Sequence, residues 1–163
     1  MTSTSTSQIQ MTSSAFGYGT RIPDQFTCEG EDISPPLGWT GCPVEARSLA
    51  LVCDDPDAPR GTWVHWVLYN LPPGAVELTQ GLPAAVAELP SGARQGRNDS
   101  GEIGYSGPCP PPGKSHRYFF RLYALDIMLN LPSGATKAEL EGAMDQHILG
   151  QGTLMGVYQR GKA

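Results

Sequence analysis

Three aspartates and a histidine lie in one short stretch, residues 53–66. Three carboxylates fall within four positions of its loop, and a histidine stands at the head of the strand that follows: Asp54, Asp55, Asp57 and His65. An apolar run on each side of the loop predicts a strand, a tight proline-containing turn and a second strand. Because a rigid scaffold holds groups at strand ends in fixed directions, this arrangement is typical of a site. Asp and Pro also favour ordinary turns, so the loop alone does not decide.

A second histidine, His116, begins the strongest predicted strand, residues 115–125, which is rich in aromatic side chains. Like His65, it follows a proline-rich loop, here residues 104–113. If the two strands are neighbours in one sheet, both imidazoles open at the same end. The carboxylates at the exit of a third strand then share that end.

Two further residues complete a candidate pocket. Tyr118 lies two residues after His116, so its phenol points to the same face of the strand. Gly107 has no side chain and would let its backbone amide approach a ligand. Two imidazoles, a phenol and an N–H group form a donor set that suits an oxyanion such as phosphate.

The charge of such a pocket depends on pH. Imidazole titrates near ~6.5, so small shifts decide its charge at neutral pH. A neighbouring carboxylate favours the charged ring and orients it, but would repel a dianion unless it is protonated or turned to a histidine. We therefore expect anion binding to tighten towards pH ~6, at a coupled site in which no single residue owns a pKa.

Three other interpretations compete with anion binding. An Asp–His pair can act as a general acid–base unit in a small hydrolase or isomerase, although the chain has no Gly-x-Ser-x-Gly nucleophile motif. Two histidines and an aspartate can bind zinc, and surface loops could inhibit a protease or a kinase. Structural roles are also common, and we interpret His147 as a helix-face residue, Trp63 and Trp66 as packing residues and Cys109 as a small filler.

Composition limits the class of protein. The 163 residues are predicted to form one domain, residues 8–163, after a disordered polar tail, residues 1–7. A net charge of −5 without any Lys/Arg cluster argues against nucleic-acid binding. No apolar run reaches the ~18 residues that a membrane span needs, and the N-terminus has no secretory signal. A soluble, cytoplasmic protein is therefore expected.

The cysteines show neither Cys-x-x-Cys pairs nor zinc-ligand spacing: Cys28, Cys42, Cys53 and Cys109. Reduced thiols are the default in a cytoplasm. Cys28 and Cys42 could form a bridge in an oxidising compartment, and the sequence leaves the redox state open.

Short apolar runs between frequent glycines and prolines predict a mainly β fold. Strands are expected at residues 8–16, 37–39, 47–53, 64–71, 115–125 and 153–159. Strict alternation places His65 on the same side of its strand as Val67 and Tyr69. One helix is expected near residues 136–149, beginning with a capping box at Thr136.

A series of motifs follows in order along the chain: Ser34-Pro-Pro-Leu37, Asp55-Pro-Asp-Ala-Pro59, His65-Trp66, Asn70-Leu-Pro72, Asn98-Asp99, Gly104-Tyr-Ser-Gly-Pro108, Pro110-Pro-Pro-Gly113, His116-Arg-Tyr118 and Ala124-Leu-Asp126. With this order the chain, from Gln8 to Arg160, resembles the phosphatidylethanolamine-binding protein family, also called Raf-kinase-inhibitor-protein-like, in its bacterial and archaeal branch. The resemblance implies a Greek-key β-sandwich of antiparallel sheets, with a small anion pocket at one end of the large sheet. In that family the pocket takes phosphate, acetate, cacodylate or a phosphoethanolamine head group. Carried over, its lining is Asp55, Asp57, His65, Gly107, Pro108, His116 and Tyr118.

The resulting prediction is a non-enzymatic, regulatory binding protein for a small anionic ligand, either a phosphate or phospholipid head group or a carboxylate. No cofactor, metal or catalytic residue is expected. Eukaryotic relatives inhibit kinases or proteases, which implies such a protein as a partner. This chain has Val64 where those relatives often carry a second histidine, so kinase inhibition is the least transferable part. The sequence leaves open whether the protein is a monomer or a homodimer.

Overall fold

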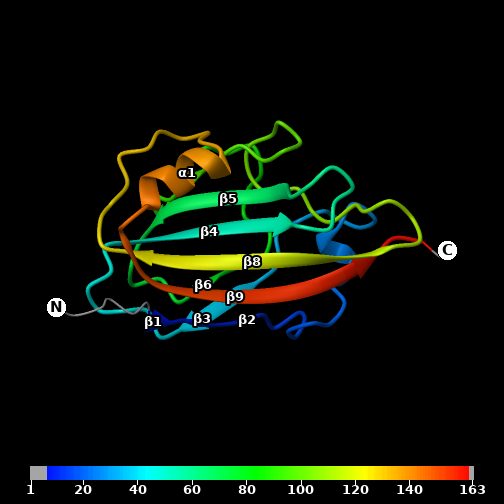
Figure 1. Ribbon diagram of the computed structural model, residues 1–163, viewed down its shortest axis with the longest axis horizontal. Coiled ribbons are helices and arrows are strands. Elements are labelled where there is room, and N and C mark those ends of the chain that lie inside the picture. Colours follow the sequence, from blue (N-terminus) through cyan, green and yellow to red (C-terminus); the bar gives the residue numbers. More distant parts are fainter. Residues whose placement is uncertain (1–6, 162–163) are drawn as a thin grey trace.

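A computed structural model of the chain describes residues 7–161, which form two β-sheets packed face to face (Figure 1). In the large sheet the order is β1 (Ser7–Gln8), β9 (Ile148–Gln159), β8 (Ser115–Leu125), β4 (Ser48–Asp55), β5 (Trp63–Leu71) and β7 (Arg94–Gln95). In the small sheet the order is β2 (Gln10–Thr12), β3 (Leu37–Thr40) and β6 (Glu77–Leu78). Neighbouring strands run antiparallel, while β1 lies parallel to β9. The predicted β-sandwich with a short helix is confirmed.

Apolar side chains from both sheets fill the space between them. The large sheet contributes Leu49, Leu51, Trp66 and Phe120, and the small sheet contributes Met11, Leu37, Trp39 and Leu78. On the other face of the large sheet, helix α1 (Lys137–Met144) packs Leu140 and Met144 against Val52 and Val67. Because both faces are covered, β4 and most of β5 are fully buried, which accounts for their continuous apolar sequences.

Helix α1 begins as predicted but ends earlier. Thr136 accepts a hydrogen bond from the Glu139 backbone N–H, and the Glu139 carboxylate accepts one from the Thr136 backbone, which completes the capping box. The predicted end near residue 149 is wrong. The helix stops at Met144, and Gln146 takes the left-handed conformation with φ of 67°. Between residues 7 and 161, no helix has the length and hydropathy needed to span a membrane.

The chain passes directly from α1 into β9. The strand starts at Ile148, well before the predicted start at residue 153. His147, which we expected on the helix face, lies just before the strand with its Nδ1 atom 2.8 Å from an Asp126 carboxylate oxygen. His147 therefore forms a half-exposed polar pair with Asp126, at the end of β8 opposite to His116.

The N-terminal segment crosses from one sheet to the other. Residues 1–6 of the predicted tail lie outside the described residues, and Ser7, which the sequence assigned to that tail, begins β1 opposite Gly150. The single strand predicted at residues 8–16 is instead two short strands, β1 and β2. The reason is that the chain leaves the large sheet at Ile9 and joins the small one.

Candidate functional site

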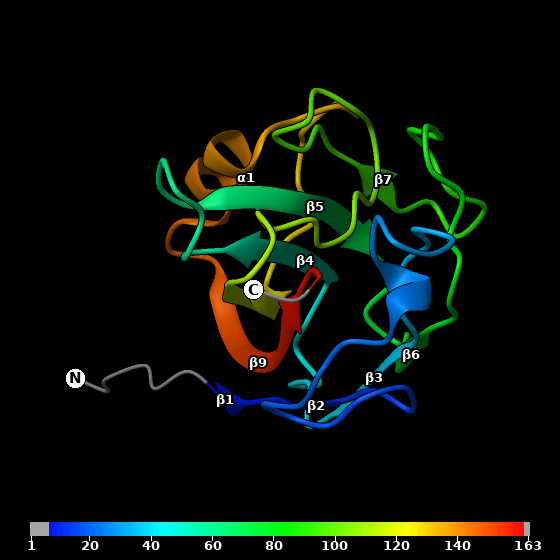
Figure 2. The same ribbon diagram turned by 90° about the vertical axis from the view of Figure 1, so that its right-hand side faces the viewer.

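Three strand ends meet at one end of the large sheet. Strand β4 lies between β5 and β8 and runs antiparallel to both, so its exit lies beside their starts. Asp55 ends β4, while His65 and His116 lie near the starts of the other two strands. Figure 2 turns this end of the sandwich towards the viewer. The two imidazoles share one end as predicted, although β5 and β8 are not direct neighbours.

A β-bulge turns His65 towards this site. Cys53 pairs with Trp66 and the next residue, Asp54, pairs with Val64, which leaves His65 as an extra residue in β5. Strict alternation had placed His65 with Val67 and Tyr69, and that prediction is wrong. Those two residues pack on the helix side of the sheet. The bulge re-aims the imidazole to the opposite face, as bulges near sites commonly do.

The two imidazoles are each held by their Nδ1 atom. His116 Nδ1 lies 2.7 Å from Asp55 Oδ2, and both side chains are buried. His65 Nδ1 lies 2.6 Å from the carbonyl oxygen of Ser106. Because a carbonyl oxygen only accepts, His65 Nδ1 carries the hydrogen. Among residues 7–161 neither Nε2 atom has a hydrogen-bond partner, so each is available to a bound molecule.

The ring of Tyr118 packs against both imidazoles, and its hydroxyl has no hydrogen-bond partner. Its ring centroid is 5.3 Å from that of His65 and 6.4 Å from that of His116. Within the described part of the chain, this hydroxyl oxygen is the fully buried side-chain polar atom that lacks a hydrogen bond. Burial and the charge of Asp55 raise the pKa of Tyr118 well above its ordinary value. The phenol is therefore a neutral O–H donor, and buried polar groups are rarely left unpaired.

Burial sets the charge of His65. It lowers the pKa of the imidazole below its ordinary value, although the hydrogen bond to Ser106 and the negative charge of Asp55 oppose the shift. The ring is thus neutral at neutral pH, with Nδ1–H donated to the carbonyl and Nε2 left as an acceptor. An anion can therefore hydrogen-bond to Nε2 only if the anion carries a proton that it donates, or if the ring takes up a proton and donates it to the anion.

These groups line a cavity of about 250 Å³. Its polar wall consists of Asp55, His65, Ser100, Ser106, His116 and Tyr118, and the rest is Ala58, Pro59, Trp63, Gly107, Cys109, Pro110 and Pro111. The volume lies below the ~300–1,000 Å³ of typical pockets for drug-sized ligands, so a small polar group fits best. Two of the residues predicted for the pocket, Asp57 and Pro108, are not part of this lining.

The two tryptophans next to the site have different roles. Trp66 is buried, and its indole N–H donates to Gln95 Oε1 at 2.8 Å, in agreement with the packing role predicted for it. Trp63 is 41% exposed and lines the cavity. The packing role predicted for Trp63 is therefore wrong, because this first residue of β5 lies at the rim of the cavity with much of its side chain exposed.

Asp57 is engaged by Arg117 at the outer edge of the site. Its carboxylate accepts from the backbone N–H, Nε and Nη2 of Arg117 at 2.8–2.9 Å. These contacts lower the pKa of Asp57 to about 2 from the ordinary 3.8. The carboxylate thus orders the start of β8 and is not free to face a ligand.

We predict that Asp57→Asn leaves anion affinity within about twofold of the wild type, as expected for a substitution outside a site. Because the folded pKa is depressed, the carboxylate stabilises the protein above pH ~4 and loses this effect as pH falls towards ~2. The pair is partly exposed, so the stability difference is small. Urea unfolding at pH 7 and pH 3 measures it, and a variant that loses anion binding would contradict this placement of Asp57.

Gly107 serves the packing of two loops rather than a ligand. Its backbone N–H donates to Asp32 Oδ1 at 2.7 Å. A Cβ atom at this position would lie 2.3 Å from the Phe26 carbonyl oxygen and 2.5 Å from Asp32 Oδ1. The predicted free amide is therefore wrong, because the loop that contains Asp32 already uses it.

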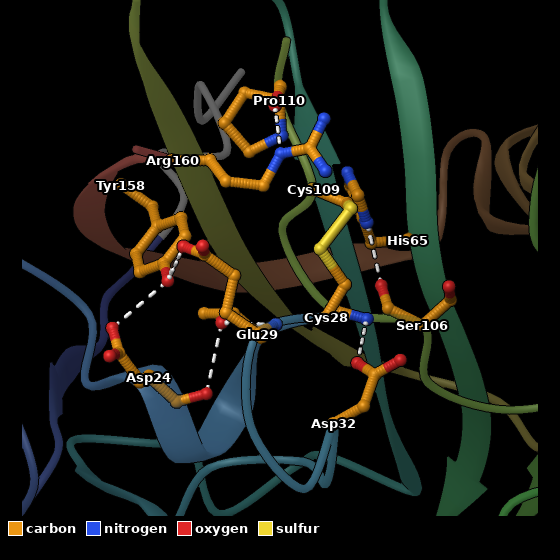
Figure 3. Close-up of a disulfide and its surroundings, with 12 residues drawn as sticks. Asp24, Cys28, Glu29, Asp32, His65, Ser106, Cys109, Pro110, Tyr158 and Arg160 are labelled. Atoms are coloured by element: carbon orange, nitrogen blue, oxygen red, sulfur yellow. Dashed lines mark hydrogen bonds between the residues drawn. A yellow bond between two sulfur atoms is a disulfide. The ribbon is translucent and has the colours of Figure 1, made fainter. Parts of the chain in front are cut away.

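A disulfide joins the same two loops (Figure 3). Cys28 follows the short 3-10 helix η1 (Asp24–Phe26), and Cys109 lies 81 residues further along, in the proline-rich loop. The Cys28 backbone N–H also donates to the Pro108 carbonyl oxygen at 3.1 Å. The alternative pairing of Cys28 with Cys42 is wrong, because Cys42 is a free thiol. The filler role of Cys109 is also wrong, because Cys109 forms the disulfide.

Several contributors to the site were missed from the sequence. Ser106 acts through its backbone carbonyl, which no side-chain motif could indicate. Asp32 lies in a segment that the sequence showed only as loop, and Ser100 lies in another. The one available signal was a pair of cysteines, each within a glycine- or proline-rich loop. Between residues 7 and 161, no group of three His, Cys, Asp or Glu side chains has the arrangement of a metal site.

Comparison with known proteins identifies the family. A family model described as "Phosphatidylethanolamine-binding protein" matches residues 12–159. The chain belongs to the phosphatidylethanolamine-binding protein family. Every cavity residue lies within the matched region, so the site is part of the family domain.

Relatives in this family come from archaea and bacteria. A UPF0098 protein of Methanothermobacter thermautotrophicus is 56% identical over 147 residues, covering 90% of this chain and 96% of the relative. A UPF0098 protein of Chlamydia trachomatis is 46% identical, with 93% and 99% covered. The resemblance to the bacterial and archaeal branch is confirmed.

Solved structures of the phosphatidylethanolamine-binding protein family share the fold. The crystal structure of a homologue from Chlamydia trachomatis superposes with a TM-score of 0.85 at 45% identity, covering 94% of this chain and 98% of that one. Escherichia coli YbcL, described as a member of the mammalian family, gives a TM-score of 0.86 at 32% identity, with 93% and 98% covered.

Proposed function

We propose that this member of the family is a binding protein whose cavity captures a phosphate-type or carboxylate anion. One observation carries the proposal: the buried hydroxyl of Tyr118 has no hydrogen-bond partner, and the Tyr118 ring packs against both imidazoles in the lining of the same cavity. A buried hydroxyl without a partner costs free energy, and a bound oxyanion would remove that cost by accepting from it. The cavity has the size of a small polar group, such as a phosphoethanolamine head group.

The carboxylates near the cavity support anion binding more than they oppose it. Asp55 is directed at His116 Nδ1 and at the backbone N–H of Asp57. A carboxylate that accepts from Nδ1–H orients the ring and leaves Nε2 free for a ligand. Asp57 is neutralised by Arg117. Neither carboxylate therefore presents an unpaired charge to the ligand.

Binding of the anion in the cavity is coupled to the binding of protons. Because burial lowers the pKa of His65, its Nε2 is unprotonated at neutral pH and can accept a hydrogen bond but cannot donate one. A phosphate monoanion supplies the missing proton through its own hydroxyl, whereas a dianion requires the ring to become protonated. Both routes favour binding as pH falls from about 8 to about 6.

The proposal predicts that inorganic phosphate and phosphoethanolamine bind with Kd between about 1 μM and 1 mM, and more tightly at pH 6 than at pH 8. Isothermal titration calorimetry on the wild type, with glycerol as an uncharged control, measures both properties. Titrations in buffers of different ionisation enthalpy give the number of protons taken up. A wild-type protein that binds neither ligand at any of these pH values would overturn the proposal.

A second candidate function is hydrolysis, because the buried Asp55–His116 pair has the geometry of an acid–base dyad with its outer nitrogen free. Turnover of p-nitrophenyl phosphate and p-nitrophenyl acetate, with His116→Asn as control, tests it. Release of nitrophenol that depends on His116 would favour the hydrolase. Binding without turnover would favour the binding protein.

A further inference from the structure

One wall of the cavity is a proline-rich segment, residues 106–111, which we call the cavity wall. It has no regular secondary structure, and it supplies Ser106, Gly107, Cys109, Pro110 and Pro111 to the lining. The wall also holds His65, because the Ser106 carbonyl oxygen accepts from the Nδ1 atom of that ring. The position of this segment therefore sets both the shape of the cavity and the direction of one imidazole.

The wall rests on a second segment, residues 24–32, which we call the supporting loop. Strand β9 holds this loop independently of the wall, since the Tyr158 hydroxyl bonds with the carboxylates of Asp24 and Glu29 (Figure 3). Arg21 forms an ion pair with Asp24 and covers the Tyr158 ring. The supporting loop is thus a fixed base from which the wall is held.

One covalent bond and a few hydrogen bonds hold the wall. The Cys28–Cys109 disulfide is the covalent link between the wall and the loop. The Gly107 backbone N–H donates to Asp32, the Cys28 N–H donates to Pro108, and the Arg160 side chain donates to the Pro110 carbonyl oxygen. These contacts are non-covalent and individually weak, so they hold the wall less firmly than the disulfide does.

The disulfide is open to reductants. Both Cys28 and Cys109 are exposed, whereas the free thiol of Cys53 is buried. Exposed disulfides are the ones that exchange with external thiols, while buried ones resist reduction. This disulfide is accessible and also fixes one side of the cavity. The redox state of the surroundings can therefore change the shape of the cavity through this bond.

We propose that the Cys28–Cys109 disulfide is a redox switch that controls anion binding in the cavity, an inference that rests on the proposed function. A dithiol reductant transfers two electrons and two protons to the bond, leaving two thiols and a reductant that has become a disulfide. The wall is then held by hydrogen bonds alone, and its binding-competent position becomes a minor state. If about a tenth of molecules keep that position, the apparent affinity falls about tenfold.

The experiment compares phosphate affinity at pH 6.5 for the oxidised and the dithiothreitol-reduced wild type by calorimetry. The Cys28→Ser/Cys109→Ser variant mimics the reduced state, and Cys42→Ser, which removes a free thiol elsewhere, is the matched control. Hydrogen exchange at the Gly107 and Cys28 amides reports the wall directly. The expected result is a loss of about tenfold in affinity with faster exchange at both amides after reduction or in the double variant, and redox-dependent behaviour retained in Cys42→Ser.

Equal affinity and equal exchange in the two redox states would overturn the switch while leaving the proposed function intact. If the oxidised protein binds no phosphate, the proposed function fails and the switch fails with it as a control of binding. Circular dichroism separates local from global effects. Loss of the whole fold on reduction would show that the bond is structural, and would overturn the switch as well.

Discussion

The double variant His65→Asn/His116→Asn is expected to lose at least about 100-fold in phosphate affinity. An asparagine amide N–H can replace each Nδ1–H, so Ser106 and Asp55 keep their donors while both Nε2 atoms disappear. Hydrogen bonds to charged groups are worth about 1.5–3 kcal/mol each, so losing two gives this effect or more. Calorimetry at pH 6.5 measures it.

The control for this variant is Asp57→Asn, which changes a charge at the same end of the sheet but outside the lining. Each single histidine variant is expected to lose part of the affinity. If the double variant binds phosphate within about twofold of the wild type, which is the effect expected of a surface substitution, the two imidazoles do not bind the anion.

The substitution His116→Ala is expected to lower the free energy of unfolding by about 3–5 kcal/mol, because it leaves the buried carboxylate of Asp55 without the imidazole that lies 2.7 Å from it. Asp55→Ala is expected to cost less, since it removes the buried carboxylate itself. Replacing both residues removes the orphaned charge. The double-mutant cycle should therefore give a coupling energy of about 2 kcal/mol, measured by urea unfolding at pH 7.

The chain contains a matched control for this cycle. His147 and Asp126 form a pair through the same two kinds of atom, at 2.8 Å against 2.7 Å for His116 and Asp55, but their side chains are 37% and 41% exposed instead of 5% and 4%. Exposed pairs couple by less than about 1 kcal/mol. Equal coupling energies in the two cycles, or additive effects at Asp55 and His116, would show that burial does not govern the strength of the Asp55–His116 pair.

Local sequence patterns predicted the strands of the large sheet that are covered on both faces. Strand β8 matches its predicted bounds, because it is rich in aromatic residues and its buried positions alternate with more exposed ones along most of its length. The start of α1 was also predictable, since a capping box is a local signal. The end of the helix was not, because the apolar spacing continues into β9 while the backbone at Gln146 leaves the helix.

The candidate site was only partly predictable because it depends on contacts between distant segments. The sequence indicates that His65, His116 and Tyr118 belong to one end of the sheet. It does not reveal the bulge that turns His65, because register depends on the partner strand. Nor does it reveal that Asp57 belongs to Arg117 or that Cys28 pairs with Cys109, since such pairing depends on which loops the fold brings together.

The most direct test of anion binding by His65 and His116 is ¹⁵N NMR of the histidine side chains during a phosphate titration at pH 6.5. The chain has three histidines, and His147, at the opposite end of β8, serves as an internal reference. If the cavity binds the anion through both imidazoles, the Nε2 resonances of His65 and His116 shift together and saturate with phosphate, while those of His147 stay unchanged. Resonances of His65 and His116 that do not respond, or that move no more than those of His147, would contradict binding through both imidazoles.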